Sequence, residues 1–299
     1  MSFSVAAKPF IDLRKLLASI SDISIVTDEQ DIITWLLNIN NGNKSDQLTA
    51  HRTLITLFAS SNGIADDLPD AVSKTDIRKI MDDSAAGNAR LNNMCEIYGH
   101  GLRIFDLALD MPTKKSYLEP TLGEKPCAAT VAFGMEAIAG GADVLGVGAL
   151  ATAADVVAAT LIQKLYPDMA DAIALEMPAE TQLINRIVSA CDETKPLEIL
   201  ATIGGREVAA IIGAIISART EHISVILDDL ASLAAALILH KEDANLTTHC
   251  RLAICQTELM AKLLKKMNMK SVLVTDSPKL NGANAALAMG VLKANVAVQ

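Results

Sequence analysis

Aromatic residues are scarce in this chain. Phe, Trp and Tyr make up 3% of its 299 residues, whereas hydrophobic residues make up 51%. The core must therefore be built from Ala, Leu, Ile, Val and Met, and closely packed Ala-rich helices on a sheet suit such a core. The length allows one large domain, or a large domain with a small one.

Clusters of basic charge and long apolar runs are also missing. No stretch concentrates Lys and Arg, and the net charge is −9, so we expect no nucleic-acid partner. No run of about 18 apolar residues free of charge suggests a membrane span, and the first residues lack the apolar region of a signal peptide. We therefore expect a cytoplasmic protein that does not enter a membrane.

The cysteines form no recognisable pattern. They are odd in number, and no pair has the CxxC spacing of a metal or redox site. The five are Cys95, Cys127, Cys191, Cys250 and Cys255. We interpret them as reduced thiols and expect neither a metal nor a cofactor.

Short β-rich runs alternate with helical patterns along most of the chain. The expected strands are 53–60, 101–109, 142–148, 224–228 and 271–275. The expected Ala-rich helices are 150–165, 196–220, 230–240 and 250–267. Such alternation predicts an α/β fold with a parallel, Rossmann-like sheet flanked by helices on both faces.

The first residues follow a different pattern from the rest. Apolar residues at helical spacing predict two helices within residues 4–38, and the Asn and Gly content of 38–46 predicts a loop. We expect a small helical lobe of residues 1–47, joined by the tail 288–299. An α/β domain of residues 48–287 would make up the rest.

Ligands of parallel sheets bind at the carboxyl ends of the strands. The positions that follow the expected strands are 61–63, 146–148, 228–229 and 276–277. The pair Asp228 and Asp229 has the chemistry of an acid pair or a metal site, but no companion ligands are identifiable. We therefore interpret Asp228 as the N-cap of the next helix and an ordinary loop carboxylate.

Four segments, in order, resemble the motifs of one family. Residues 196–239 contain GGREVAA with a following Gly and Asp, and 85–109, 142–159 and 280–294 match further motifs more loosely. Together they resemble the nicotinate-nucleotide:dimethylbenzimidazole phosphoribosyltransferase family over most of the chain.

The resemblance implies a reaction and an assembly. Phosphoribose passes from nicotinate mononucleotide to 5,6-dimethylbenzimidazole, giving the α-ribazole phosphate of the cobamide lower ligand. A carboxylate takes the proton from the attacking base, and an anion stabilises the positive charge on the sugar. Members are homodimers, so we expect a homodimer, or a heterodimer with an active paralogue. The ligand would be nicotinate mononucleotide or an aromatic base.

The motif that should carry the catalytic Glu departs from the family. Aligning residues 285–287 on the A-A-L of the L-G-E-G-T-G-A-A-L motif places Asn281 at the Glu, followed by Gly282. An amide has no usable basicity, and losing a general base costs about 10²–10⁴-fold in rate. Asn281 either hydrogen-bonds a ligand or is the turn residue of an Asn-Gly pair.

The other substrate-facing motifs depart as well. Gly146 and Gly148 survive from the phosphate loop, where they would make either its turn or a close strand–helix contact, but the family's Asn-Thr-Thr reads as residues 149–151, Ala-Leu-Ala. The Asp-His-Gly after the first strand reads Ser-Asn-Gly at 61–63. From these positions we select Gly146, Gly148, Asp228 and Gly282 as candidate substrate-binding residues.

Three hypotheses follow. We favour a family member that keeps the scaffold while its standard catalysis is impaired or lost. The second is an active phosphoribosyltransferase on the usual or an altered acceptor, in which Asp143, Asp228 or Asp276 replaces the Glu. The third is a non-catalytic protein, either a partner subunit or a purely structural or storage protein; the structural role would leave the pocket filled by Leu150 and Met260.

Overall fold

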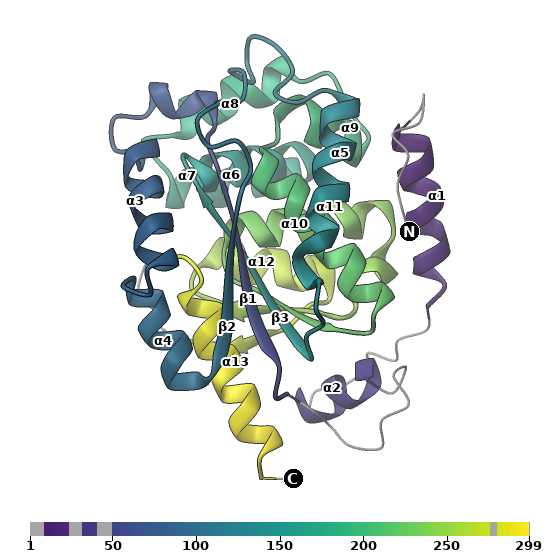
Figure 1. Cartoon of the computed structure of the whole chain (residues 1–299). Coiled ribbons are helices and arrows are strands. Elements are labelled where there is room, and N and C mark those ends of the chain that lie inside the picture. The colour runs from purple at the N-terminus through teal and green to yellow at the C-terminus, as the bar shows by residue number, and fades with distance from the viewer. Residues whose placement is uncertain (1–8, 24–31, 41–49, 276–279, 299) are drawn as a thin grey trace.

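The structure is a computed structural model that describes residues 9–23, 32–40, 50–275 and 280–298. A six-stranded, all-parallel sheet lies at its centre, with the order β2-β1-β3-β4-β5-β6 (Figure 1). The strands are β1 (Thr53–Ser60), β2 (His100–Asp106), β3 (Val144–Ala151), β4 (Ser224–Leu227), β5 (Cys250–Ile254) and β6 (Ser271–Leu273). The predicted α/β class, with a parallel sheet between helices, is confirmed.

Strand β1 shows why this sequence forms a sheet buried on both faces. All eight of its residues are buried, as expected of a parallel strand covered on two sides. Leu54 and Phe58 point into one hydrophobic cluster, and Ile55 and Leu57 into a second cluster on the other face. Since β1 pairs with β3 along its whole length, the carboxyl ends of both strands meet at one edge.

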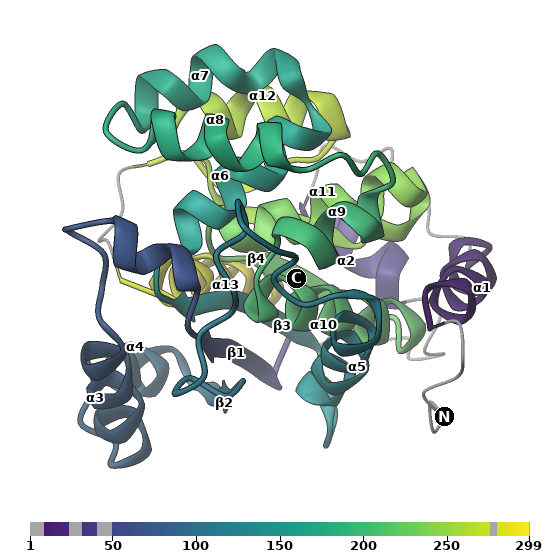
Figure 2. The same ribbon diagram turned by 90° about the horizontal axis from the view of Figure 1, so that it is seen from above.

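Helices cover both faces of the sheet (Figures 1 and 2). One face is packed by α2 (Ile32–Asn40), α3 (Lys74–Ala85), α4 (Arg90–Tyr98) and α13 (Ala283–Val296). The other is packed by α1 (Pro9–Ser21), α5 (Glu124–Gly134), α6 (Ala154–Leu165), α9 (Pro196–Ile203), α10 (Arg206–Thr220) and α11 (Leu230–Glu242). Beside α6 and α11 lie α7 (Ala170–Glu176), α8 (Thr181–Ala190) and α12 (Glu258–Met267) (Figure 2). Single 3₁₀ turns occupy Gly63–Asp67, Met135–Ile138, Pro167–Met169 and Ala244–Thr247.

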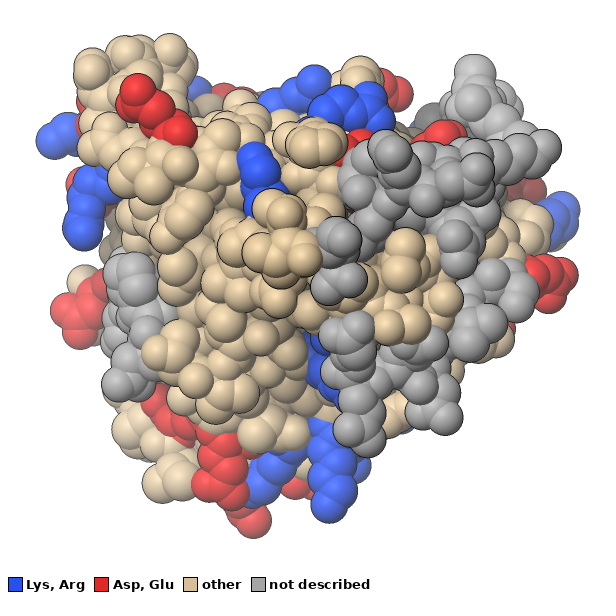
Figure 3. All heavy atoms as spheres, turned by 90° about the horizontal axis from the view of Figure 1, so that it is seen from below, with Lys and Arg blue, Asp and Glu red and all other residues tan. Residues whose placement is uncertain are grey.

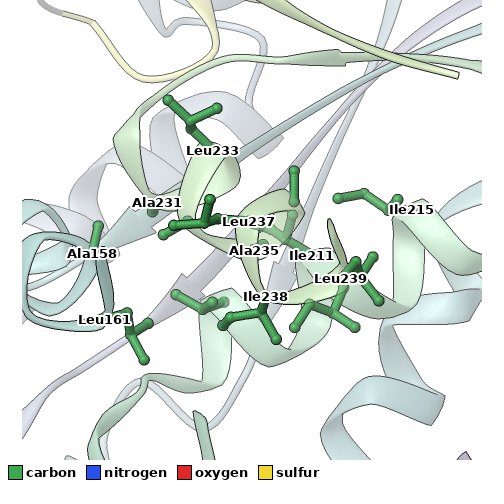
Figure 4. Packing of buried hydrophobic residues seen from close by; sticks show 14 of the residues in the cluster. Ala158, Leu161, Ile211, Ile215, Ala231, Leu233, Ala235, Leu237, Ile238 and Leu239 are labelled. Atoms are coloured by element: carbon green, nitrogen blue, oxygen red, sulfur yellow. The ribbon is translucent and has the colours of Figure 1, made fainter. Parts of the chain in front are cut away.

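The core around α11 has the composition that the sequence predicted. Every residue from Leu230 to Leu239 is buried, so this helix is enclosed on all sides by apolar neighbours (Figure 4). Small residues allow the close helix packing. A side chain at Gly213 of α10 would place its Cβ 1.9 Å from the carbonyl oxygen of Val131 in α5. The motif at 196–239 therefore includes contacts of the scaffold.

Several predicted boundaries were wrong; strand β2, for example, ends at Asp106 and not at residue 109. Residues 250–254 form β5 instead of the start of a helix, because a short apolar run fits a buried strand and a buried helix equally well. The predicted helix 196–220 is two helices, broken at Gly204 and Gly205. Strand β3 continues to Ala151, three residues beyond its predicted end, so that α6 begins at Ala154.

The division into a small lobe and an α/β domain stays a prediction. Helix α1 packs against α5 and α10, and α2 packs against α13, which itself lies on the sheet. No helix among the described residues is long and apolar enough to cross a bilayer.

Candidate active site

A cavity of about 1300 Å³ lies at the carboxyl edge of the sheet. Its walls come from the residues that follow β3, β4 and β5, from the loop at 67–72, and from the starts of α6, α12 and α13. This is the position where ligands of parallel α/β sheets bind. The architecture predicted this edge, and the cavity lies there.

Part of the cavity wall is apolar. The larger apolar side chains include Ile77, Ile80, Leu150, Met177, Leu183, Met260 and Leu280. Leu150 and Met260 line the cavity and leave it open, which contradicts the filled pocket of the third hypothesis. A wall of this kind, with a few polar groups at fixed positions, is typical of sites for ring compounds.

Asn281 lies exposed on the cavity wall, immediately before α13. Its Nδ2 donates a hydrogen bond of 2.7 Å to the carbonyl oxygen of Ala149. Gly282, with φ +80°, makes the turn into the helix, so the Asn-Gly pair has the geometry of a turn. The amide of Asn281 thus ties the start of α13 to the end of β3.

Asp228 follows β4 and is 2% exposed. Its Oδ2 accepts a hydrogen bond of 2.7 Å from the backbone N–H of Gly282, and its Oδ1 one of 2.7 Å from that of Ala285. Asp228 therefore accepts hydrogen bonds from two backbone N–H groups at the N-terminus of α13. The prediction that it caps the next helix in sequence and is an ordinary loop carboxylate was wrong, because the chain turns it into the crevice between β4 and α13.

Asp229 is the N-cap of α11. Its Oδ1 accepts a hydrogen bond of 2.7 Å from the backbone N–H of Ser232. Its Oδ2 accepts one of 2.7 Å from the backbone N–H of Ala149 in β3. Both oxygens are thus bound by backbone donors, one from a helix and one from a strand.

The two aspartates form an acid pair at the cavity, in which Asp228 is buried and Asp229 is half-buried. Burial and the neighbouring Asp229 raise the pKa of Asp228 to about 7, although the hydrogen bonds that it accepts from backbone N–H groups lower this pKa. Burial raises the pKa of Asp229 to about 6. Two carboxyl groups that titrate near neutrality are typical of functional sites. The described residues contain no group of three or more His, Cys, Asp or Glu arranged to hold a metal.

Of the other two carboxylates considered as replacements for the Glu, Asp143 is not in the cavity wall. Asp143 precedes β3 and lies at the opposite edge, where it bonds Arg52 with 3.0 Å between Nη2 and Oδ1. Figure 3 shows the molecule from that side, and charged side chains lie mostly toward its rim. The expectation that Asp143 faces the pocket is wrong. Asp276 lies outside the described residues.

Gly146 and Gly148 lie within β3, and the turn expected at them was placed too early. A Cβ at Gly146 would lie 2.9 Å from Sδ of Met289, so this glycine permits close packing of α13. A Cβ at Gly148 would lie 2.9 Å from that of Asp228. The turn into α6 instead includes Ala153, with φ +53°. Neither glycine lines the cavity, and neither does Gly282; substrate binding by all three stays a prediction.

The Ser-Asn-Gly segment after β1 belongs to a buried network away from the cavity wall. Nδ2 of Asn62 donates to Glu207 over 3.0 Å, and Ser60 donates to the same carboxyl group. Glu207 is 0% exposed, and burial raises its pKa. The Glu of the GGRE motif therefore connects α10 to the end of β1.

Sequence reasoning missed several acidic residues of the cavity. Asp155 comes from the first turn of α6, and Glu176 and Glu180 flank the turn between α7 and α8. Oε1 of Glu176 accepts a hydrogen bond of 2.8 Å from the backbone N–H of Leu259. Only the fold brings these segments together, because 83 positions separate the two partners in the chain.

The fold and the cavity are those of an α/β protein with space for a ligand at the carboxyl edge of its sheet, and a family model described as phosphoribosyltransferase matches residues 30–299. The nicotinate-nucleotide–dimethylbenzimidazole phosphoribosyltransferase of Rhizobium rhizogenes is 35% identical over 257 residues, covering 82% of this chain and 76% of that protein. The Methylocella silvestris protein of the same name is 36% identical over 260 residues, covering 83% and 76%. This chain belongs to the nicotinate-nucleotide–dimethylbenzimidazole phosphoribosyltransferase family.

A solved structure shares the fold. The crystal structure of the protein of that name from Thermus thermophilus matches with a TM-score of 0.79 and 19% identity. The match covers 96% of this chain and 95% of that chain.

Proposed function

We propose that this chain keeps the ligand-binding cavity of its family while the standard transfer of phosphoribose is impaired or lost. The supporting observation is Asn281, which the motif alignment places where the family carries its catalytic Glu. Its amide is uncharged and already donates to Ala149. Asn281 therefore neither takes a proton from the acceptor base nor stabilises positive charge on the sugar.

The cavity itself supports continued ligand binding. Its volume of about 1300 Å³ exceeds the usual range for small-molecule sites, and its apolar residues suit a heterocyclic ring. A protein that had lost both catalysis and ligand binding would have no reason to keep this space open, because filling it would stabilise the core.

The acid pair supports a second candidate function, an active phosphoribosyltransferase on the usual or an altered acceptor. Asp228 and Asp229 have pKa values raised to about 7 and about 6, in the range that suits a general base at neutral pH. Against this, every carboxyl oxygen of the pair accepts a backbone N–H. We therefore place this function second.

A transfer assay tests the proposal. The purified chain is incubated with nicotinate mononucleotide and 5,6-dimethylbenzimidazole, and the product is quantified by chromatography beside the Rhizobium rhizogenes relative. We expect a rate at least about 10²-fold below that of the relative, as loss of a general base predicts. A rate within about tenfold of the relative would contradict the proposal, and Asp228→Asn and Asp229→Asn would then identify the replacement base.

Two variants at one position identify the missing group. Asn281→Glu supplies a carboxylate at the cavity wall, and Asn281→Gln is the matched control with the same length and no charge. A gain in rate confined to the Glu variant would assign the deficit to the absent carboxylate. An equal response of both variants would assign it elsewhere in the cavity.

A further inference from the structure

Three of the helices that begin at the cavity wall, α11, α12 and α13, hold carboxylates of the protein at their N-termini. Asp229 caps α11, and Asp228 accepts two backbone N–H groups at the start of α13. Glu176 accepts the backbone N–H of Leu259, in the first turn of α12, over 2.8 Å. Helix N-termini are the usual places where proteins bind phosphate, because their N–H groups are unpaired. At these three helices an incoming phosphate would meet N–H groups that already have acceptors, and carboxylates of the same sign of charge beside them. Helix α6 has no side-chain cap, but its first turn carries the carboxylate of Asp155 at the cavity wall.

At the end of β3, too, a carboxylate of the protein accepts a backbone N–H group. Strand β4 ends at Leu227, whereas β3 continues to Ala151, so the last N–H groups of β3 have no strand partner on that side. Oδ2 of Asp229 fills this place by accepting the N–H of Ala149, and Asn281 donates to the carbonyl oxygen of the same residue. The Asp229 carboxylate thus takes the backbone donor at the crevice of the sheet.

The other charged side chains of the cavity wall also disfavour the binding of a phosphate. Seven acidic side chains line the cavity and a single basic one, Arg186, is among the described lining residues. The acidic ones are Asp67, Asp70, Asp155, Glu176, Glu180, Asp228 and Asp229. Lys115 compensates Asp67 with a contact of 2.6 Å, and Arg186 lies 3.8 Å from the ring centre of Tyr117. The wall stays negative, and a negative wall favours neutral or cationic ligands over a dianion.

We infer that this cavity binds an unphosphorylated nucleoside or free heterocyclic base and discriminates against 5′-phosphates, with Asp229 as the residue that sets the discrimination. The inference rests on the proposed function, since it takes the cavity to be the ligand site. A ring that carries positive charge, such as an N-ribosylated pyridinium, gains from the acidic wall. The apolar side chains around Leu150 and Met260 suit its faces.

Two ligands that differ only by phosphate test the inference. Nicotinate riboside and nicotinate mononucleotide are titrated calorimetrically into the full chain. We expect the riboside to bind at least about tenfold more tightly than the mononucleotide, because repulsion and the occupied N–H groups act on the phosphate alone.

Asp229→Asn is the discriminating variant. Asparagine has a single carboxamide oxygen, which keeps the cap on Ser232, whereas its NH₂ group cannot accept the N–H of Ala149. The substitution therefore releases one donor and removes one charge. We expect the preference for the riboside to fall by about tenfold, from both changes together. Asp229→Ser keeps a capping oxygen and is the second variant should the first fail to fold.

Asp70→Asn is the matched control. It removes the same charge from the exposed rim of the cavity, where no hydrogen bond of Asp70 to a backbone N–H exists among the described residues. We expect its ligand preference to change by less than about threefold, because an exposed charge is screened.

The outcomes separate the two proposals. Tighter binding of the mononucleotide to the wild-type protein would overturn the inference, even where the transfer assay shows no turnover and the proposed function stands. An unchanged preference in both Asp229 variants would overturn it as well. Binding of neither ligand to any variant would overturn the inference and also the retention of a ligand cavity. A preference for the riboside that falls in the Asp229 variants but not in Asp70→Asn would support it.

Discussion

Oδ2 of Asp228 accepts a hydrogen bond of 2.7 Å from the backbone N–H of Gly282, which lies 54 residues further along the chain. This contact joins the carboxyl end of β4 to the first turn of α13, and so fixes the part of the cavity wall that carries Asn281. It also depends on Gly282 having a left-handed backbone, with φ +80°. The two residues therefore allow separate tests of the local geometry.

Gly282→Ala should destabilise the protein through both strain and a clash. A left-handed alanine costs about 1–2 kcal/mol, and the new Cβ would lie 2.8 Å from Cδ2 of Leu91. Gly87→Ala is the matched control, because Gly87 has φ +77° and a Cβ added there would meet nothing within 4 Å. We expect urea unfolding to show a loss for Gly282→Ala that exceeds the control by about 1 kcal/mol or more. Equal losses would mean that α13 shifts to relieve the contact.

Asp228→Asn should destabilise the protein although it keeps the size of the side chain. One of the two N–H groups of α13 would face an amide NH₂ instead of an oxygen, leaving a buried donor without a partner. Such a loss costs about 1–3 kcal/mol. Unfolding in urea, followed by circular dichroism, measures it, and Asp70→Asn at the exposed rim should change stability little. A stable Asp228→Asn protein would show that the N–H groups find other acceptors.

The strands were the part of the fold most open to prediction. Thr53–Ser60 is a continuous run of β-rich residues, and its predicted bounds match the structure. Strand β5 was missed because Cys250–Ile254 is too short for its periodicity to separate strand from helix, and an actual helix follows it closely. Its place in the sheet comes from pairing with β4 and β6, which no local pattern encodes.

The site was predictable only at the level of strand ends. The rule that ligands bind where strands end selected Asp228, which lines the cavity, and the same rule would have excluded Asp143, which precedes its strand. The contact of Asp229 with Ala149 and that of Glu176 with Leu259 join positions 80 and 83 residues apart. Such contacts arise from the packing of whole elements, so the acidic character of the cavity could not be read from sequence.

Cysteine labelling tests the packing of the core. All five cysteines are free, four are buried, and Cys255 is half-buried. Burial raises the pKa of Cys95 to about 11 and also that of the more exposed Cys255. Because only an accessible thiolate reacts, we expect iodoacetamide to label Cys255 first in the native protein and the others only after unfolding. Peptide mass spectrometry identifies the order, and Cys255→Ser should remove the first labelling step. Early labelling of Cys95 would indicate that α4 opens locally.

The acid pair should make stability depend on pH in a defined direction. The pKa values of Asp228 and Asp229, raised to about 7 and about 6, lie above the value of about 3.9 for an unfolded aspartate. The folded protein therefore holds protons that the unfolded chain has released. The contribution of these bound protons to the free energy of unfolding is fully present below about pH 4 and is lost as the pH rises to about 7.

Comparison with a variant isolates this contribution from other titrating groups. Buried His249, with a pKa lowered by burial to about 3, acts oppositely, since its contribution is lost as the pH falls from about 6.5 to about 3. Asp229→Asn leaves His249 unchanged but removes one carboxyl group of the pair. We expect the stability of this variant relative to the wild type to rise between about pH 4 and pH 7, measured by urea unfolding across that range. A constant difference would show that the backbone N–H groups at Ala149 and Ser232 hold the carboxylate ionised throughout, and would exclude Asp229 as a general base near neutral pH.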